Sequence, residues 1–223
     1  TMSGSMPLVT TESLRMSLAM QASSDISDND AYDTVSGAYI DVSGTLTAAN
    51  KLDISCGYLQ GTVDLPATAD FETPQALTYT SWLYVDNSHT GTSTLVSANE
   101  SPIMTVQTNK LYMGSTEVAT LDSSWNRVSA VVDGTNGSAY VNRGKIADVS
   151  FTDLSFTNVQ VGSDSTNVYL YDAAVYNNAQ TDVGVIAPYF RTLKPVEASM
   201  PMHAAIDISS ITPVVESTVI DIY

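Results

Sequence analysis

The chain is poor in cysteine, and this limits the ways in which it can be stabilised. Its 223 residues include one cysteine, Cys56. A disulfide needs two thiols, so an internally disulfide-bonded scaffold of the kind common in small secreted domains is excluded. Cys56 lies in LDISCGYLQG, among apolar and strand-forming residues, and this setting predicts a buried, unreactive thiol.

Long apolar runs are also missing from the sequence. No stretch of about 18 apolar residues occurs, so no membrane-spanning helix is expected. The N-terminal segment TMSGSMPLVTTESLRMSLAM has no basic region followed by a continuous apolar core. We therefore expect no secretory signal peptide in it.

Basic residues are few. Eight Lys and Arg stand against 24 Asp and Glu, which gives a formal net charge of −16. Nucleic acids and anionic membranes are unfavourable partners, because this charge repels both and a phosphate-binding surface needs cations that converge. An acidic surface of this kind is typical of a protein kept soluble by its charge. The basic residues are scattered: Arg15, Lys51, Lys110, Arg127, Arg143, Lys145, Arg191 and Lys194.

Catalytic motifs are missing as well. The sequence contains no GxSxG, P-loop or HExxH motif. Its glutamates do not form the alternating acidic pattern with which a retaining glycoside hydrolase places two carboxyl groups about 5 Å apart. The two histidines, His89 in NSHTG and His203 near the C-terminal end, are expected to be solvated loop residues rather than catalytic or zinc-binding ones. We therefore expect no enzymatic activity.

Strand-forming sequence is what the chain has in abundance. Hydrophobic residues make up 43% of it, enough for a substantial core. Short alternating runs separated by turn residues recur roughly every 8 to 12 residues, which predicts a single antiparallel β-sandwich over residues 12–190. Residues 1–11 and 191–223 are predicted to be terminal arms. Expected strands are 14–20, 35–42, 57–65, 76–85, 93–97, 102–107, 109–113, 116–121, 126–133, 138–142, 145–151, 157–162, 167–176 and 183–190, and a helical turn is an alternative within NNAQTDVGV.

Two elements are especially clear. In ALTYTSWLYVDN both alternating faces carry bulky residues, which indicates a strand at the centre of the sheet. In SWNRVSAVVDGTNGSAYVNRGK, a strand with alternating valines leads through DGTNG to a returning strand, which predicts a hairpin. Trp125, at the start of this hairpin, is expected to anchor it in the core.

Four segments together resemble laminin G-like, concanavalin A-like jelly-roll domains. They are SWNRVSAVVDGTNGSAYVNRGKIAD, ALTYTSWLYVDN, VGSDSTNVYLYDAAVYNNAQT and LRMSLAMQASSDISDNDAYDTVSGAYID, and they occur in the family's order over about residues 12–190. The resemblance implies a jelly-roll sandwich. Many members of this family place calcium at their loops and bind glycans, so the resemblance implies both as candidate ligands.

Calcium is the one inorganic ligand that the sequence suggests. Asp25, Asp28, Asp30 and Asp33 crowd one polar segment, and hard cations prefer several oxygen ligands from a flexible loop. The segment lacks the glycine and glutamate of an EF-hand. A merely hydrated acidic loop is the alternative.

Glycan binding needs aromatic faces beside polar groups. Tyr169 and Tyr171 lie two residues apart in one predicted strand and so share a face, with Tyr112 and Tyr140 as further aromatic candidates. Packing within the sandwich is the alternative role for these side chains.

Two functions fit these features. The first is a non-enzymatic structural or attachment protein on the surface of a virus or phage particle, as a capsid decoration, fibre or tail component. It would contact copies of itself or other particle subunits through the β-prone arm of residues 191–223, with Val215, Val219, Ile222 and Tyr223 as contacts. The second is a carbohydrate-binding module of a microbial surface or secreted protein.

Overall fold

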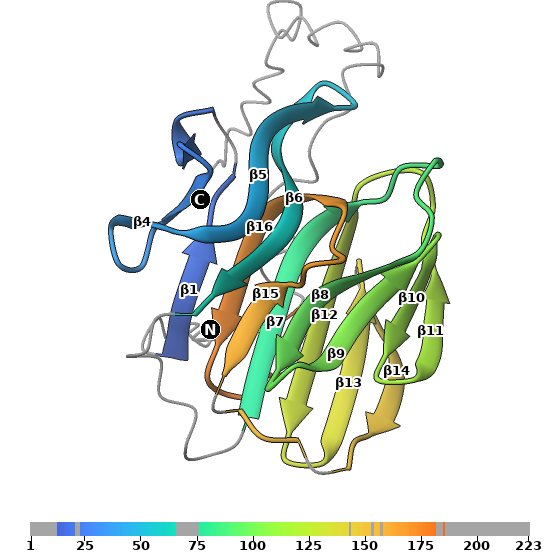
Figure 1. Cartoon of the computed structure of the whole chain (residues 1–223). Coiled ribbons are helices and arrows are strands. Elements are labelled where there is room, and N and C mark those ends of the chain that lie inside the picture. The colour runs from blue at the N-terminus through green and yellow to red at the C-terminus, as the bar shows by residue number, and fades with distance from the viewer. Residues whose placement is uncertain are drawn as a thin grey trace, which may run out of the picture.

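The computed structural model describes residues 13–20, 23–65, 76–142, 144–152, 154–156, 158–181 and 185. In this part of the chain, strands dominate and all pairings are antiparallel, so the predicted all-β fold is confirmed (Figure 1). The short 3₁₀ turn η2 is Ser23–Asp25. The strands are β1 Leu14–Leu18, β2 Ile26–Ser27, β3 Asp30–Asp33, β4 Ala38–Ile40, β5 Val42–Lys51, β6 Ile54–Asp64, β7 Ala76–Tyr84, β8 Thr92–Ala98, β9 Ser101–Gln107, β10 Lys110–Met113, β11 Thr116–Thr120, β12 Asn126–Asp133, β13 Asn136–Val141, β14 Gly144–Ser150, β15 Val159–Gly162 and β16 Val168–Tyr176.

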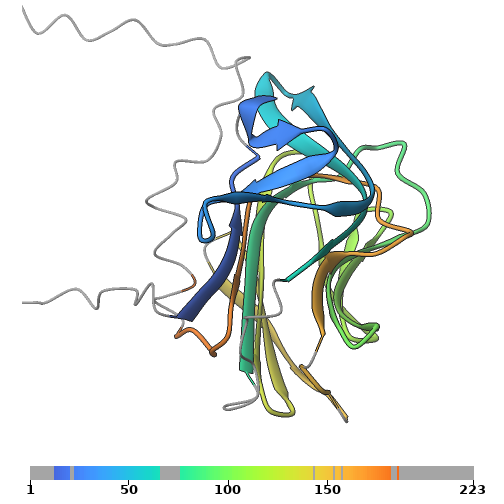
Figure 2. The ribbon, with the colours of Figure 1, turned by 60° about the vertical axis from the view of Figure 1, so that its left-hand side comes forward.

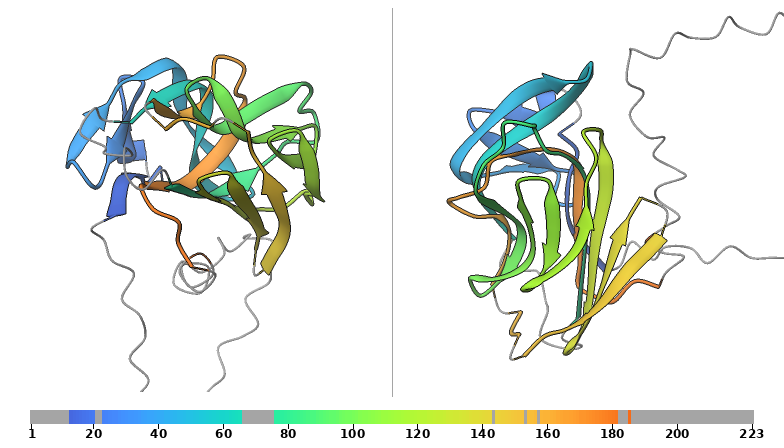
Figure 3. Two further views of the ribbon diagram at one scale, coloured as in Figure 1. Left: turned by 90° about the horizontal axis from the view of Figure 1, so that it is seen from below. Right: turned by 90° about the vertical axis from the view of Figure 1, so that its right-hand side faces the viewer.

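The sheet folds on itself into two layers (Figure 2). One layer has the order β11-β10-β9-β8-β15, and the other has the order β16-β7-β12-β13-β14, with β1 also on the free side of β16. Strand β6 belongs to both, because residues 62–64 pair with β15 and residues 57–59 pair with β16. Seen from below, the layers curve almost into a barrel (Figure 3).

The main core lies between the layers and follows from the alternation of the sequence. On β7, Leu77, Tyr79 and Leu83 point into it and are fully buried. On β12, the inward residues are Val128 and Val132, as the hairpin pattern predicted. All nine residues of β7 are buried, so its predicted central place is confirmed.

A glycine pair permits the strong bend of the β5–β6 hairpin. Gly44 and Gly61 face each other in the register, and Gly44 has a φ of 122°. A Cβ on Gly44 would lie 2.4 Å from the carbonyl oxygen of Gln60 and 2.7 Å from the Cα of Gly61. The two backbones therefore approach more closely than any side chain allows. The bend carries the hairpin tip over the outer face of β16 and β7.

A second apolar cluster lies under that hairpin tip, outside the main core. It contains Trp82, Tyr84, Trp125 and Cys56, and Trp125 donates its indole N–H to the carbonyl oxygen of Lys51 at 3.2 Å. Trp125 is fully buried in this second core cluster, so its expected role as a core anchor is confirmed, and the part that it anchors is the hairpin tip. Cys56 is 2% exposed, and burial raises the pKa of its thiol to about 11, in keeping with an unreactive group.

The structure differs from the predicted strands mainly near residue 50. Strand β5 and the start of β6 were missed, because β5 pairs on one side only and just two of its ten residues are buried. At the other end, the expected strand 183–190 is wrong at Val185, whose amide donates to Thr181 in a helical i to i−4 bond. The predicted 126–142 hairpin is confirmed, with Asp133 opposite Asn136.

Both predicted arms fall outside the described residues, as do the proposed contact residues Val215, Val219, Ile222 and Tyr223. The domain boundaries at 12 and 190 therefore stay predictions. Across the described residues, no helix has the length and apolar character to cross a membrane.

Candidate functional site

A row of tyrosines crosses three strands on the outer face of the sheet. In the register, Tyr169 of β16 stands opposite Tyr58 of β6 on one side and Tyr84 of β7 on the other. The ring centroids of Tyr58 and Tyr169 are 4.6 Å apart, and those of Tyr84 and Tyr169 are 5.9 Å apart. Tyr58 and Tyr169 keep part of their surface exposed, whereas Tyr84 is buried, so Tyr58 and Tyr169 offer the accessible aromatic surface of the row.

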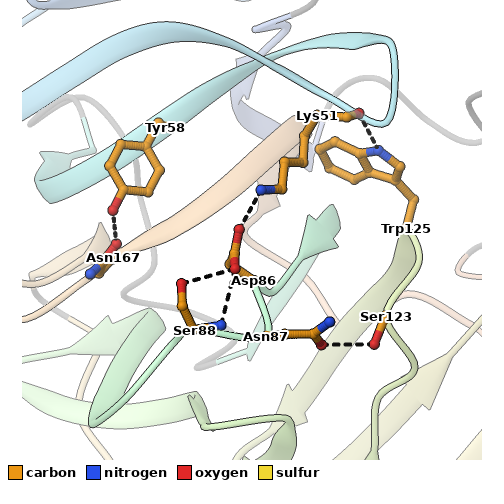
Figure 4. Close-up of polar contacts among 8 residues, drawn as sticks. All are labelled: Lys51, Tyr58, Asp86, Asn87, Ser88, Ser123, Trp125 and Asn167. Atoms are coloured by element: carbon orange, nitrogen blue, oxygen red, sulfur yellow. Dashed lines mark hydrogen bonds and ion pairs between the residues drawn. The ribbon is translucent and has the colours of Figure 1, made fainter.

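Lys51, at the end of β5, lies at the hairpin tip and points towards Asp86 (Figure 4). Its ammonium nitrogen lies 4.8 Å from the ring centroid of Tyr169 and 5.1 Å from that of Tyr84. The same nitrogen forms an ion pair with the carboxylate of Asp86, in the loop after β7. The lysine thus ties the hairpin tip to the β7–β8 loop.

Asp86 is the strongest acid of the site. The hydrogen bond from Lys51, followed by those from the amide and hydroxyl of Ser88, lowers the pKa of Asp86 to about 2. The bond from Asp86 raises the pKa of Lys51 in turn. Both groups are therefore charged at neutral pH, and their charges largely cancel each other.

Asn167 closes the other side of the site. It lies in the β15–β16 loop, and its amide oxygen accepts a hydrogen bond from the hydroxyl of Tyr58 (Figure 4). Its backbone N–H donates to the hydroxyl of Ser93 at 2.9 Å, which holds the loop against β8. Its side chain is exposed, and its amide N–H groups are directed to no partner among the described residues.

Between these groups lies a small polar hollow of about 80 Å³, lined by Tyr58, Asp86, Ser88, His89, Asn167 and Tyr169. His89 is 6% exposed, and neither of its ring nitrogens has a hydrogen-bond partner. The expectation of a solvated loop residue was therefore wrong. The amide of His89 donates to the carbonyl oxygen of Asp86 at 2.8 Å, and this turn draws the imidazole inward. His203 lies outside the described residues.

The two predicted glycan-binding tyrosines take different places. Tyr169 lines the hollow, whereas Tyr171 packs edge-on against Trp125, with ring centroids 6.3 Å apart. Tyr140 lies elsewhere, in a cluster with Val131 and Val185. Tyr112 is on β10, in the opposite layer. Of the aromatic candidates, Tyr169 alone is among the residues that line the hollow.

The acidic segment folds into η2, β2 and β3 rather than one open loop. Asp33 is fully buried and accepts hydrogen bonds from the amides of Ser17, Val35 and Ser36, so its carboxylate is used by the backbone. Partial burial, and then its hydrogen bond with Asp41, raise the pKa of Asp30. Asp25 ends η2, and Asp28 lies in the turn before β3.

The carboxylates of this acidic segment are not arranged around a common point where they could coordinate one metal ion. Within the described residues, no three His, Cys, Asp or Glu side chains are placed to hold a metal ion. Calcium binding by Asp25, Asp28, Asp30 and Asp33 stays a prediction.

Comparisons with known proteins add to the fold. No protein-family model matches the sequence, and no curated protein sequence matches it. Several solved structures do. A Trypanosoma rangeli sialidase in complex with 2,3-difluorosialic acid is 13% identical with a TM-score of 0.60, over 85% of this chain and 35% of that one. A botulinum neurotoxin type C structure, described with cell entry dependent on two ganglioside molecules, is 13% identical with a TM-score of 0.53, over 81% of this chain and 51% of that one.

A botulinum neurotoxin DC binding domain in complex with rat synaptotagmin II is 12% identical with a TM-score of 0.55, over 81% of this chain and 52% of that one. This chain thus spans about a third of the sialidase and half of the toxin structures. At these identities the likeness concerns the fold alone, which is a β-sandwich of the lectin-like, jelly-roll kind.

Proposed function

We propose that this chain is a non-enzymatic carbohydrate-binding module, and that the hollow between Tyr58, Asp86, His89 and Asn167 is its glycan site. The observation that carries the proposal is His89. A buried polar side chain without a partner costs stability, and such groups are retained where a ligand supplies the missing hydrogen bonds. Here the imidazole lines a hollow beside an accessible aromatic row.

The site combines the two kinds of contact that a sugar needs. The tyrosine row supplies an apolar face for the C–H side of a sugar ring. Asn167 supplies amide N–H groups, the imidazole of His89 one donor and one acceptor when neutral, and Asp86 a carboxylate. Directional hydrogen bonds of this kind fix the orientation of a bound hydroxylated ligand.

The related folds favour the same class of ligand. The sialidase structure holds a sialic acid derivative, and the botulinum neurotoxin structure is described with gangliosides. We infer that the present chain shares the recognition of glycans with these proteins, and that it is a laminin G-like, concanavalin A-like domain as its four sequence segments indicate. Absence of activity is part of the proposal, because the imidazole of His89 is not hydrogen-bonded to any hydroxyl that it would activate as a nucleophile.

A glycan array with the purified chain tests the proposal. Wild type is expected to bind a defined set of glycans, and Asn167→Ala to lose at least about tenfold in affinity, which corresponds to one or two hydrogen bonds. Asn136→Ala is the matched control, since Asn136 is also an exposed asparagine, at the start of β13 and outside the site. Absence of binding by wild type, or equal losses in both variants, would contradict the proposal.

A second pair of variants addresses the aromatic row. Tyr169→Ala should abolish binding, whereas Tyr39→Ala removes a tyrosine that is 46% exposed on β4 and should leave binding unchanged. Circular dichroism of both variants verifies that the sandwich is intact. Binding by a folded Tyr169→Ala protein at wild-type affinity would exclude the row from the site.

We further propose that the module serves attachment within a large assembly, such as the surface of a virus or phage particle, with an extracellular or cell-surface setting as the alternative. This finer role rests on the acidic composition and the β-prone run that ends in Val219, Ile222 and Tyr223. Light scattering of the full chain is expected to show an oligomer that is lost when residues 191–223 are removed. A monomeric full chain would argue against this role and leave glycan binding untouched.

A further inference from the structure

A second hollow lies on the other side of the β15–β16 loop, on the layer that contains β8 and β15. It measures about 260 Å³, and it is lined by Pro102 of β9 and by polar side chains from β6, β8, β15 and the neighbouring turns. The residues on which the inference depends are Thr62, Thr94, Ser97, Glu100, Gln160 and Asp164.

Three hydroxyl-bearing residues of this hollow are buried. Thr62 is 7% exposed, Thr94 is 6% exposed and Ser97 is 4% exposed. None of the three hydroxyls takes part in a hydrogen bond within the described part of the chain. These residues line the hollow, and their hydroxyl oxygens are not among the fully buried side-chain atoms that lack a partner, so the hydroxyls are open to the hollow. There they can donate to and accept from a ligand with hydroxyl groups of its own.

Acceptor groups lie around these hydroxyls. Glu100 from the β8–β9 turn and Asp164 from the β15–β16 loop contribute carboxylates. The side-chain amide of Gln160 donates to Asp64 at 2.6 Å, which leaves its carbonyl oxygen as an acceptor. Donors and acceptors are therefore mixed, and this combination suits a neutral sugar unit better than an anion, which the two carboxylates would repel.

A short, well-fixed loop separates the two hollows. The amide of Thr166 donates to the carbonyl oxygen of Ser163 at 2.8 Å, and the hydroxyl of Thr166 donates to the carbonyl oxygen of Thr94 at 2.8 Å. Asp164 lines the larger hollow and Asn167 lines the smaller one, three residues further on. Three residues span at most about 10 Å, so one ligand can reach both hollows.

The volumes of the two hollows also indicate that one ligand occupies both. The hollow beside Tyr169 measures about 80 Å³, which is small against the roughly 300–1,000 Å³ of ordinary ligand pockets. With the larger hollow of about 260 Å³ added, the combined space comes into that range. A third hollow of about 190 Å³, beside Asn87 and Ser123, is lined mostly by exposed side chains and lacks buried hydroxyls.

We propose that the two hollows are adjoining subsites for one oligosaccharide, which stacks on Tyr169 at one end and places a neutral sugar unit on Thr62, Thr94 and Ser97 at the other. The inference rests on the proposed glycan-binding function. It adds that the ligand is a chain of at least two sugar units that crosses the β15–β16 loop. The unit in the larger hollow is uncharged.

The test is a printed array of mono- to hexasaccharides, neutral and sialylated, followed by calorimetry on the glycans that bind. Thr62→Val removes a hydroxyl at nearly constant volume and is expected to weaken binding of the longer glycans about tenfold. Binding of single sugars should be unchanged. Thr105→Val is the matched control, because Thr105 is a threonine of similar burial on β9 that does not line the hollow.

Asp164→Asn is the second variant, at an exposed loop position where the fold is not at risk. It is expected to weaken the same longer glycans severalfold. Binding that neither increases with chain length nor responds to Thr62→Val and Asp164→Asn would overturn the inference and leave the proposed function standing. If the wild-type protein bound no glycan, both the inference of two subsites and the proposed glycan-binding function would be contradicted.

Discussion

Individual side chains of the site carry polar groups that the fold itself leaves unused. His89 is the clearest case, since both of its ring nitrogens are buried and unpaired. Lys51 and Asp86 show the opposite situation, because they satisfy each other and hold the hairpin tip in place. The site thus contains one residue that costs stability and one pair that supports it.

Replacement of His89 by leucine should separate binding from stability. His89→Leu is expected to raise the free energy of unfolding by about 1 kcal/mol, because an unsatisfied buried polar group is removed. The melting temperature should rise by about 2–4 °C, measured by calorimetry, while glycan binding is lost. His89→Gln retains an unpaired polar group and should show no such gain. A destabilised His89→Leu protein would mean that the imidazole supports the fold.

The charge of Asp86 should make stability depend on pH in an acidic window. Its folded pKa of about 2 is below its ordinary value of 3.8, so its contribution is complete above about pH 5 and is lost as the pH falls towards 2. Asp86→Asn should cost about 1 kcal/mol at neutral pH, a small value because the ion pair is partly exposed.

Urea unfolding between pH 2 and pH 7 measures this effect. The difference between wild type and Asp86→Asn should shrink as the pH falls and be mostly lost by pH 2. Lys51→Met removes the main cause of the lowered pKa and should flatten the same pH dependence. A difference that stays constant with pH would assign the loss to something other than this carboxylate.

Few of the site residues could be predicted from the sequence. Tyr169 was found because alternation within a strand is visible locally. Lys51 ends β5, Asp86 lies in the loop after β7 and Asn167 lies in the β15–β16 loop, and the strand register brings these three places together. No short stretch of the sequence indicates that these three residues lie close together in the fold. His89 lies in a polar segment, NSHTG, and its burial follows from a turn that the sequence does not single out.

Among the elements, the β5–β6 hairpin matters most for the site. Its tip covers Trp125 and delivers Lys51, and its bend depends on the close approach of Gly44 and Gly61. Strands with two buried faces, such as β7, were predicted almost to the residue. Strand β5 was not, because an edge strand with mostly exposed side chains has little apolar alternation to reveal it.

Substitution of Gly44 should disturb this bend. Gly44→Ala places a methyl group 2.4 Å from the carbonyl oxygen of Gln60, so the hairpin must shift. We expect a loss of about 2–3 kcal/mol in the free energy of unfolding, measured with urea, within the range for overpacking a tight contact. Gly37→Ala is the control. Gly37 also has a positive φ, of 69°, but a Cβ there meets nothing within 4 Å, so a loss of only about 1 kcal/mol is expected. Equal losses would show that the close approach is unimportant.

At the scale of the whole molecule, the main feature is a large negative net charge. A net charge of −16 in a chain of 223 residues produces repulsion between surface carboxylates, which salt screens. Two of the described ion pairs, Lys110–Glu117 and Lys145–Asp148, are exposed and offset little of it.

Added salt should therefore stabilise the protein. A change from about 10 mM to about 300 mM sodium chloride at pH 7 shortens the screening length severalfold and should raise the melting temperature by a few degrees, roughly 2–4 °C for each kcal/mol gained. Near the sequence pI of about 4.1, the response should vanish. A melting temperature that falls with salt at pH 7 would show that attractive pairs outweigh the repulsion.

The position of β16 in the sheet affects how the sandwich folds while the chain is being synthesised. It is the last described strand, and it fits between β7 on one side and β6 and β1 on the other. Until residues 168–176 have been made, these neighbours present unpaired edges across an open slot. A peptide with the sequence VYLYDAAVY should enter that slot in a fragment that ends before residue 168, so the chain offers a natural position for fragment complementation.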